Sequence, residues 1–224
     1  LIVHISSISQ LENWVRDIPE YAIKLGNTFW PGPMTLVLRR SSLAMDFITG
    51  GQDSIGIRVP DQQVALVLTQ EFEKLGGSGI AAPSANRFGA VSPTTAQAVK
   101  DELANYLDET NDVILDGGPC QVGVESTIID CTSDTPQILR LGAITKEMIA
   151  MSTGLLVIDE PTTDIRVSGS LESHYSPSAK VVLDVNPESG DGFIAIDSIS
   201  TPAGAIRLAA PSSVEGYARE IYSA

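Results

Sequence analysis

Cysteine and histidine are scarce in this chain, which has only two of each. Cys120 and Cys131 cannot build a disulfide framework, and two histidines are too few to complete a zinc site around them. A chain without that framework fits a reducing compartment, so we expect a cytoplasmic protein. His4 and His174 lie in a strand-like and a linker-like segment, an arrangement that argues against a Ser-His-Asp triad.

Long apolar runs and basic residues are also missing. No run approaches the ~20 apolar residues of a membrane-spanning helix, and we expect no membrane partner. No charged and then apolar leader precedes Leu1, and residues 1–5 resemble a core strand, so we expect the chain to begin inside a domain. The 14 Lys and Arg face 28 Asp and Glu, giving a formal charge of −14. Such a surface repels phosphate backbones, which argues against tight nucleic-acid binding.

The common phosphate-binding loops are absent as well. The chain has no Gly-x-x-x-x-Gly-Lys sequence, and Gly76-Gly77-Ser78-Gly79 lacks the dinucleotide-binding spacing. The chain has the composition of an ordinary globular protein. Its 224 residues are 43% hydrophobic, which is enough to bury a core. An anionic substrate would therefore need a local basic pocket.

Strand-like and helix-like segments alternate through the first 158 residues, which predicts an α/β fold with a mixed sheet and flanking helices. The predicted strands are residues 1–5, 34–38, 55–59, 80–82, 113–115, 126–129, 138–141 and 155–158. The predicted helices are residues 9–18, with a Ser9/Glu12 capping box, then 19–26, 61–75, one opening at Ser92 as N-cap with Pro93 next, and 146–152.

The hydrophobic pattern lapses between residues 160 and 179, where Ser, Thr, Gly and Pro predict a linker. Strands are predicted again at residues 181–183, 193–196 and 205–208, followed by a helix capped at Ser212. These last residues are few for an independent domain, so the pattern indicates the start of a small α/β domain.

Two arginines lie inside predicted strands. Arg58 follows Ile57, and Arg140 lies between Leu139 and Leu141. A guanidinium keeps its charge, so Arg58 needs either an anionic ligand or a structural salt bridge, and spacing alone does not decide between them. A second strand arginine favours an anion-binding site.

Small polar residues follow two other predicted strands. Residues 81–94 place hydroxyl and amide side chains after a strand, where ligands collect in α/β sheets. The Thr94 and Thr95 amides at the start of the next helix could hold phosphate, although ordinary capping explains Ser92 equally simply. Ser126 and Thr127 must point to opposite faces of their strand, so only one can face a pocket.

Two large side chains also have alternative explanations. His4 could be a hydrogen-bonded imidazole of the core. Tyr175, in the predicted linker, could stack on a base or pin the linker.

Seven segments together resemble the YrdC-like threonylcarbamoyl-AMP synthase family. They are Leu1-Ile-Val-His-Ile5, Trp30-Pro-Gly-Pro-Met-Thr-Leu36, Gly56-Ile-Arg-Val-Pro60, Ala82-Pro-Ser-Ala-Asn86, Ser92-Pro-Thr94, Gly123-Val-Glu-Ser-Thr127 and Ile138-Leu-Arg140. The resemblance implies a catalytic domain over residues 1–166, a linker over 167–179 and an incomplete C-terminal domain over 180–224. The family's Lys-x-Arg signature precedes the first of these segments and lies outside this chain.

The family makes threonylcarbamoyl-adenylate and pyrophosphate from L-threonine, bicarbonate and ATP, with Mg²⁺, for a downstream transferase complex that modifies tRNA. By position, the resemblance implies that threonine is held by His4, Arg58, the Ala82 backbone and Ser126, with Arg58 on its carboxylate. It implies that ATP is held by Ser54, Ser84, Asn86, Ser92, Arg140 and Tyr175. No side chain is expected to act as a nucleophile or general base.

One departure concerns the linker. It has Ser168-Gly-Ser-Leu-Glu-Ser173 where many members have Pro-Gly-Met-Lys-Tyr and a basic residue. Two other functions remain open. A carbamoyl-adenylate-forming carbamoyltransferase uses the same domain, but with zinc-finger-like cysteines that this chain lacks. An RNA-binding module is disfavoured by the net charge.

Overall fold

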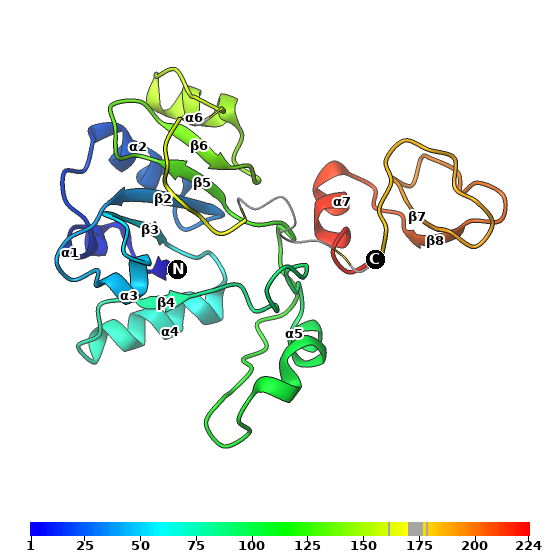
Figure 1. Ribbon diagram of the computed structural model, residues 1–224, viewed down its shortest axis with the longest axis horizontal. Helices are drawn as coiled ribbons and strands as arrows, with labels where there is room; N and C mark the ends of the chain where they lie inside the picture. The colour runs from blue at the N-terminus through cyan, green and yellow to red at the C-terminus, as the bar shows by residue number, and fades with distance from the viewer. Residues whose placement is uncertain (161, 170–176, 178) are drawn as a thin grey trace. The chain divides into compact units, whose positions relative to one another are not determined.

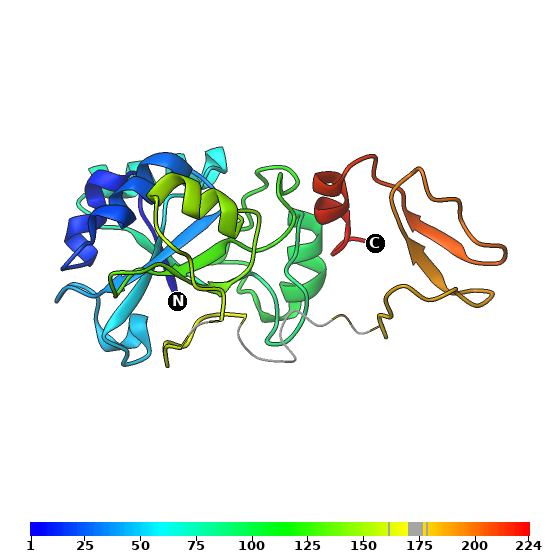
Figure 2. The same ribbon diagram turned by 90° about the horizontal axis from the view of Figure 1, so that it is seen from above.

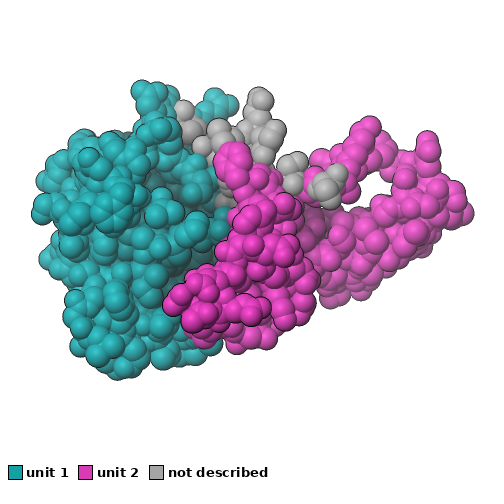
Figure 3. All heavy atoms as spheres, turned by 60° about the horizontal axis from the view of Figure 1, so that its bottom comes forward, with its two compact units in different colours: residues 1–84, 125–172 teal, residues 85–124, 173–224 magenta. Residues whose placement is uncertain are grey.

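A computed structural model describes residues 1–160, 162–169, 177 and 179–224. The chain forms two compact units, the first from residues 1–84 and 125–172 and the second from residues 85–124 and 173–224 (Figure 3, teal and magenta). Within the described residues, no helix combines the length and apolarity needed to cross a membrane.

The first unit is built on a mixed sheet of six strands in the order β4-β1-β3-β2-β5-β6 (Figure 1). The pairs β1–β3 and β2–β5 are parallel, and the other three pairs are antiparallel. This sheet confirms the predicted α/β class. The strands are β1 (Ile2–His4), β2 (Met34–Arg39), β3 (Ser54–Arg58), β4 (Ile80–Ala82), β5 (Thr127–Asp130) and β6 (Gln137–Arg140).

Helices cover one face of this sheet. Figure 2 shows α2 (Glu20–Phe29, blue) and α6 (Lys146–Thr153, yellow-green) on the same side. The one-turn helix α1 (Leu11–Trp14) packs there too, after a short 3-10 turn, and α4 (Gln63–Lys74) contributes Leu66. A further one-turn helix, α3 (Asp46–Thr49), precedes β3.

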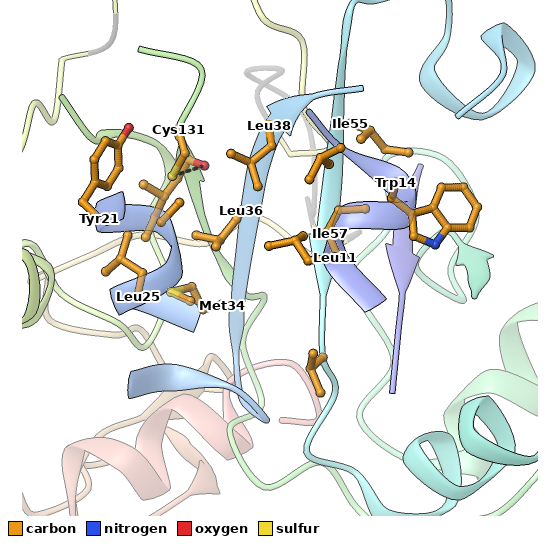
Figure 4. Close-up of a cluster of buried hydrophobic side chains, with 14 of the residues drawn as sticks. Leu11, Trp14, Tyr21, Leu25, Met34, Leu36, Leu38, Ile55, Ile57 and Cys131 are labelled. Carbon is orange, nitrogen blue, oxygen red and sulfur yellow. Dashed lines mark hydrogen bonds between the residues drawn. The ribbon is translucent and has the colours of Figure 1, made fainter. Parts of the chain in front are cut away.

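The hydrophobic core lies between these helices and the sheet (Figure 4). Strand alternation produces it, because every second side chain points to the same face. Val3, Leu36 and Ile57 occupy neighbouring register positions on β1, β2 and β3 and are fully buried. The intervening positions of the three strands face away from the helices, and they include His4, Thr35, Ser54, Gly56 and Arg58.

The second unit has fewer elements. They are α5 (Ala96–Leu103), the 3-10 helix η2 (Ala104–Tyr106), the parallel strands β7 (Gly192–Ile194) and β8 (Ile206–Ala209), and α7 (Val214–Glu220). Arg207 of β8 lies over the Phe193 ring of β7, 5.2 Å from its centroid.

Three predicted strands are wrong. No ladder includes residues 113–115 or 181–183 within the described residues, and Val113 and Leu183 are each 79% exposed. Their apolar side chains find no neighbouring strand, and an unpaired segment is not stabilised as a strand. Residues 155–158 contribute only an isolated bridge from Ile158 to Gln137.

Three predicted caps are also wrong. The first helix begins as a 3-10 turn without a side-chain cap, and the Ser9 hydroxyl lies 2.7 Å from that of Ser7. α5 is capped by Thr95, which accepts from the Ala98 amide at 3.1 Å, and not by Ser92. Thr95 has the same capping chemistry but precedes better helix formers. α7 is capped by Ser213, the neighbour of Ser212.

The predicted end of the second helix at Gly26 is wrong for a different reason. The helix continues to Phe29, and Gly26 is buried inside it. A Cβ at Gly26 would lie 2.6 Å from Ile8 Cδ1. This glycine therefore permits close packing and does not end the helix.

Candidate functional site

Polar side chains cross the face of the sheet that the helices leave open. His4 ends β1, Arg58 ends β3, Thr35 lies on β2, Ser126 immediately precedes β5, and Arg140 ends β6. Four of these five residues were predicted site residues. The row brings together a titratable imidazole, two guanidinium groups and two hydroxyls on neighbouring strands.

His4 and Arg58 are register partners on the parallel strands β1 and β3. Burial, and to a lesser extent the charge of Arg58, lower the pKa of His4 from 6.5 to about 4, while a hydrogen bond with the Ile80 backbone acts in the opposite direction. The imidazole is therefore neutral at neutral pH. A neutral imidazole can both donate and accept a hydrogen bond.

Arg58 has partners within the chain. Its Nε donates to the Gly32 carbonyl at 2.9 Å, and its Nη2 lies 3.6 Å from Asp61 Oδ1. A structural salt bridge, one of the two alternatives for Arg58, is therefore present, although its N–O distance is long. A contact of 3.6 Å is longer than a charge-assisted hydrogen bond, so a ligand anion could compete with Asp61 for the guanidinium.

Ser126 is the best-connected hydroxyl of the row. Its Oγ lies 2.8 Å from Thr35 Oγ1 and accepts from Arg140 Nη2 at 3.0 Å. Arg140 also donates to the Ser126 carbonyl from Nε and Nη2 and to the Ser168 carbonyl from Nη1. These contacts lock Ser126 between β2 and β6.

Thr127 points to the opposite face. Its Oγ1 donates to the Ile144 carbonyl at 2.9 Å and accepts from the Ile144 amide at 3.0 Å. The prediction that Ser126 and Thr127 face opposite sides of the sheet is confirmed.

A cavity of about 50 Å³ lies on the same open face. Ser54, Thr35 and Gly56 contribute to its lining from the sheet, and residues 165–168 cross over it. Gln52 holds this crossing segment: its Oε1 accepts from the Arg166 amide at 2.7 Å, and its Nε2 donates to the Arg166 carbonyl at 3.0 Å. The segment leading into the predicted linker is therefore fixed to the first unit.

The remaining predicted residues are more dispersed. Ala82 of β4 is the register partner of Ile2 of β1, and Ser84 is exposed just beyond β4. Asn86 and Ser92 belong to the second unit. Asn86 Oδ1 and Ser92 Oγ are buried and have no hydrogen-bond partner within the described residues. Tyr175 lies outside the described residues.

The described carboxylate, imidazole and thiol groups do not gather into a metal site. In the part of the chain that the structure describes, no group of three or more His, Cys, Asp or Glu is placed to hold a metal ion. Mg²⁺ is commonly carried by substrate phosphates together with one or two carboxylates. We therefore assign Mg²⁺ to no side chain.

Two residues of this site, Thr35 and Gln52, were missed by the analysis of the sequence. Alternation in residues 34–38 was a usable signal, because it places Thr35 on the face opposite Met34 and Leu36. A buried hydroxyl on that face needs a partner. Gln52 left no such signal, because its partner is the backbone of Arg166, 114 residues away.

Residues 1–142 match the Sua5/YciO/YrdC family, described as "Telomere recombination". The threonylcarbamoyl-AMP synthase of Pyrococcus abyssi is 39% identical over 192 residues, covering 84% of this chain and 54% of that protein. The threonylcarbamoyl-AMP synthase of Bacillus subtilis is 42% identical over 188 residues, covering 82% and 52%. The chain thus spans about half the length of the curated relatives it matches.

Solved structures agree with this relationship. The crystal structure of P. abyssi Sua5 complexed with L-threonine matches with a TM-score of 0.83 at 34% identity, covering 100% of this chain and 69% of that one. A family match over more than half of the chain and a structural match over its whole length lead to one conclusion. The chain belongs to the Sua5/YciO/YrdC family.

Proposed function

We propose that this chain is the larger part of an L-threonylcarbamoyladenylate synthase. The enzyme forms threonylcarbamoyl-AMP and pyrophosphate from L-threonine, bicarbonate and ATP. The observation that carries the proposal is the row of polar residues on the open face, in a fold that matches a protein crystallised with L-threonine. Both sequence relatives described above bear the name of this activity.

Four residues are proposed to bind threonine: His4, Arg58, the Ala82 backbone and Ser126. Arg58 would hold the carboxylate, because a guanidinium is the best side-chain partner for that group. Binding would exchange its long contact with Asp61 for a shorter one with the substrate. The neutral His4 adds a hydrogen-bonding group beside Arg58 without adding a second positive charge.

Six residues are proposed to bind ATP: Ser54, Ser84, Asn86, Ser92, Arg140 and Tyr175. Asn86 Oδ1 and Ser92 Oγ are buried and have no hydrogen-bond partner among the residues that the structure describes. The Ser92 hydroxyl can donate to a phosphate oxygen, whereas Asn86 Oδ1 can only accept, which suits a ribose hydroxyl or a base amino group. Mg²⁺ would arrive with the nucleotide.

The chemistry would proceed through a carbamate. The threonine amine either adds to CO₂ and loses a proton or attacks bicarbonate with loss of water, and both routes give a carbamate. An oxygen of the carbamate then attacks the α-phosphate of ATP, so that a new P–O bond forms as the P–O bond to pyrophosphate breaks. The protein's contribution is to position the two substrates and to stabilise negative charge on the phosphate oxygens. Arg58 and Arg140 supply positive charge on one face for these tasks, and no side-chain nucleophile is needed.

We place the reaction in the cytoplasm, where the product would pass to a downstream threonylcarbamoyl transferase complex that modifies tRNA. In this proposal residues 1–166 form the catalytic domain, residues 167–179 a linker and residues 180–224 part of a C-terminal domain. Described residues 162–169 include the end of the first range and the start of the linker, where Gln52 binds the backbone of Arg166 and Arg140 binds that of Ser168.

The test is release of pyrophosphate by the complete purified protein. We expect release from ATP only when both L-threonine and bicarbonate are present, with threonylcarbamoyl-AMP formed in equal amount. D-threonine serves as the control, since it presents the same groups with the wrong geometry. Release with carbamoyl phosphate but not with threonine would replace this proposal with a carbamoyltransferase.

A further inference from the structure

Thr35 and Ser126 form a buried pair of hydroxyls in the middle of the open face. Thr35 is 0% exposed and Ser126 is 4% exposed, and their oxygens lie 2.8 Å apart. Within the described part of the chain, Thr35 Oγ1 contacts no other hydrogen-bonding group, and Ser126 Oγ contacts only Arg140 in addition.

The surroundings of Thr35 fix its orientation. A Cβ built on Gly56 of the neighbouring strand would lie 3.2 Å from Thr35 Cγ2. The methyl group of Thr35 therefore points toward β3, while its hydroxyl points toward Ser126. A β-branched side chain packed in this way has little rotamer freedom.

The protons of this pair can be counted. Arg140 Nη2 can only donate, so Ser126 Oγ must accept from it. Thr35 and Ser126 together carry two hydroxyl protons, and the contact between them uses one. One proton is therefore left over, and a buried proton without an acceptor is costly.

We propose that Thr35 is a positioning residue that donates its proton to Ser126 Oγ, so that the Ser126 proton is presented to an anionic oxygen of the substrate. With Arg140 and Thr35 both donating, the two lone pairs of Ser126 Oγ are filled. The remaining tetrahedral direction belongs to its own O–H, which has one orientation left. The inference rests on the proposed function, in which Ser126 contacts threonine.

The acceptor is an anionic oxygen, either of the amino-acid carboxylate or of an ATP phosphate. Both groups only accept hydrogen bonds, so both suit a hydroxyl whose lone pairs are filled. Separate measurements with the two substrates distinguish them.

The experiment compares Thr35→Val, Thr35→Ser and Thr69→Val in the complete protein. Valine has the shape of threonine without the hydroxyl, and serine restores the hydroxyl. Thr69 is the matched control, because it is equally buried and its hydroxyl donates to the Ala65 carbonyl in α4. Thermal melting of each variant checks that the fold is retained.

We expect Thr35→Val to raise the KM for L-threonine about threefold to tenfold with little change in kcat. The variant loses the hydrogen bond to Ser126 Oγ, and the Ser126 hydroxyl is then no longer held in one orientation. Thr35→Ser should recover most of the loss, and Thr69→Val should leave both KM values unchanged. A rise in the KM for ATP alone would support the proposal with phosphate as the acceptor. Unchanged KM values for both substrates in Thr35→Val would overturn it.

A double-mutant cycle with Ser126→Ala separates positioning from general packing. If Thr35 acts through Ser126, Thr35→Val causes no further rise in KM in the Ser126→Ala background. An equal rise in both backgrounds would refute the proposal.

Calorimetric titration with L-threonine and with ATP measures the same effect without turnover. A wild type that binds these ligands but releases no pyrophosphate would disprove the proposed function, whereas a Thr35→Val variant that binds both as wild type does would disprove only this inference.

Discussion

At the scale of single residues, the two arginines of the open face are oriented by backbone carbonyl groups. Arg58 donates to the Gly32 carbonyl, and Arg140 donates to the carbonyls of Ser126 and Ser168. Carbonyl oxygens orient a guanidinium without neutralising its charge, whereas a carboxylate would neutralise it. Arg58 also forms a 3.6 Å ion pair with Asp61, so an anionic ligand has to compete with that carboxylate.

Replacement of Arg58 tests its assignment to the threonine carboxylate. Arg58→Ala should raise the KM for L-threonine at least tenfold, since a charge-assisted hydrogen bond contributes about 1.5–3 kcal/mol. Asp61→Asn is the control, because it removes the 3.6 Å ion pair but keeps the guanidinium. Steady-state kinetics should place Asp61→Asn within about twofold of wild type, as for a partly exposed pair. Equal KM values for Arg58→Ala and wild type would exclude this role.

His4 should make stability depend on pH. Its pKa in the folded chain, about 4, lies below the ordinary 6.5, so the unfolded chain takes up the proton first as the pH falls. The contribution of the buried neutral His4 to the free energy of unfolding is therefore complete above pH 6.5 and is lost as the pH falls from 6.5 toward 4. We expect the free energy of unfolding to fall by about 2 kcal/mol from this group between about pH 8 and pH 5.

Urea unfolding of wild type and His4→Asn at the two pH values measures this contribution. The His4→Asn variant should show a correspondingly smaller pH dependence, because asparagine does not titrate. The same pH dependence in both proteins would show that the imidazole is not the cause.

At the scale of elements, hydroxyl side chains within a few residues of one another have different tasks. Thr95 caps α5 by accepting from the Ala98 amide, and Thr145 caps α6 by accepting from the Met148 amide. Ser92, three residues before Thr95, has a buried Oγ without a partner in the described residues. Ser92 and Thr95 both carry a hydroxyl group, but only Thr95 contributes a capping hydrogen bond.

Two alanine substitutions separate these tasks. Thr95→Ala should lower the free energy of unfolding by about 1 kcal/mol, the usual cost of a lost N-cap. Ser92→Ala removes no hydrogen bond within the described residues and should change stability by less than about 0.5 kcal/mol. Denaturant titration of both variants measures the difference. A loss in Ser92→Ala as large as that in Thr95→Ala would show that Ser92 is the cap.

At the scale of the whole molecule, the chain is strongly acidic, with 28 Asp and Glu against 14 Lys and Arg. Seven of the described Lys and Arg side chains are already in ion pairs with acids. Long-range attraction for a polyanion is therefore weak, and anion binding depends on local geometry on the open face.

This charge balance predicts weak binding to RNA. Fluorescence anisotropy with tRNA at about 0.15 M salt should give a Kd of about 100 µM or weaker, the weak end of non-specific binding. Binding below about 1 µM that weakens steeply with added salt would instead favour an RNA-binding role. A basic RNA-binding protein of similar size is the positive control.

The alternation and helical periodicity of hydrophobic residues predicted most elements of the first unit, because these patterns depend only on residues close together in the sequence. The strands that contain Leu36, Ile57 and Ile129 were predicted within one or two residues of their observed bounds. Elements that depend on distant partners were not predictable in the same way. Residues 113–115 are apolar enough for a strand, but no described strand pairs with them.

The candidate site shows the same division. Arg58 and Arg140 stood out as charges in apolar strands, and the family motifs identified Ser126 and His4. Thr35 and Gln52 did not stand out, because their roles depend on contacts across the sheet and on the backbone of Arg166.

The sequence by itself determined the α/β class, the family, the acidic surface and most residues of the polar row, because side-chain chemistry and strand alternation depend only on order along the chain. The tertiary structure decided which hydroxyl caps α5, which face carries the row, and that Thr35 lies against Ser126. Those features depend on strand register and on hydrogen bonds between residues far apart in sequence, such as the 91 residues that separate Thr35 from Ser126. Local patterns do not encode such pairings, because they form only when the whole sheet does.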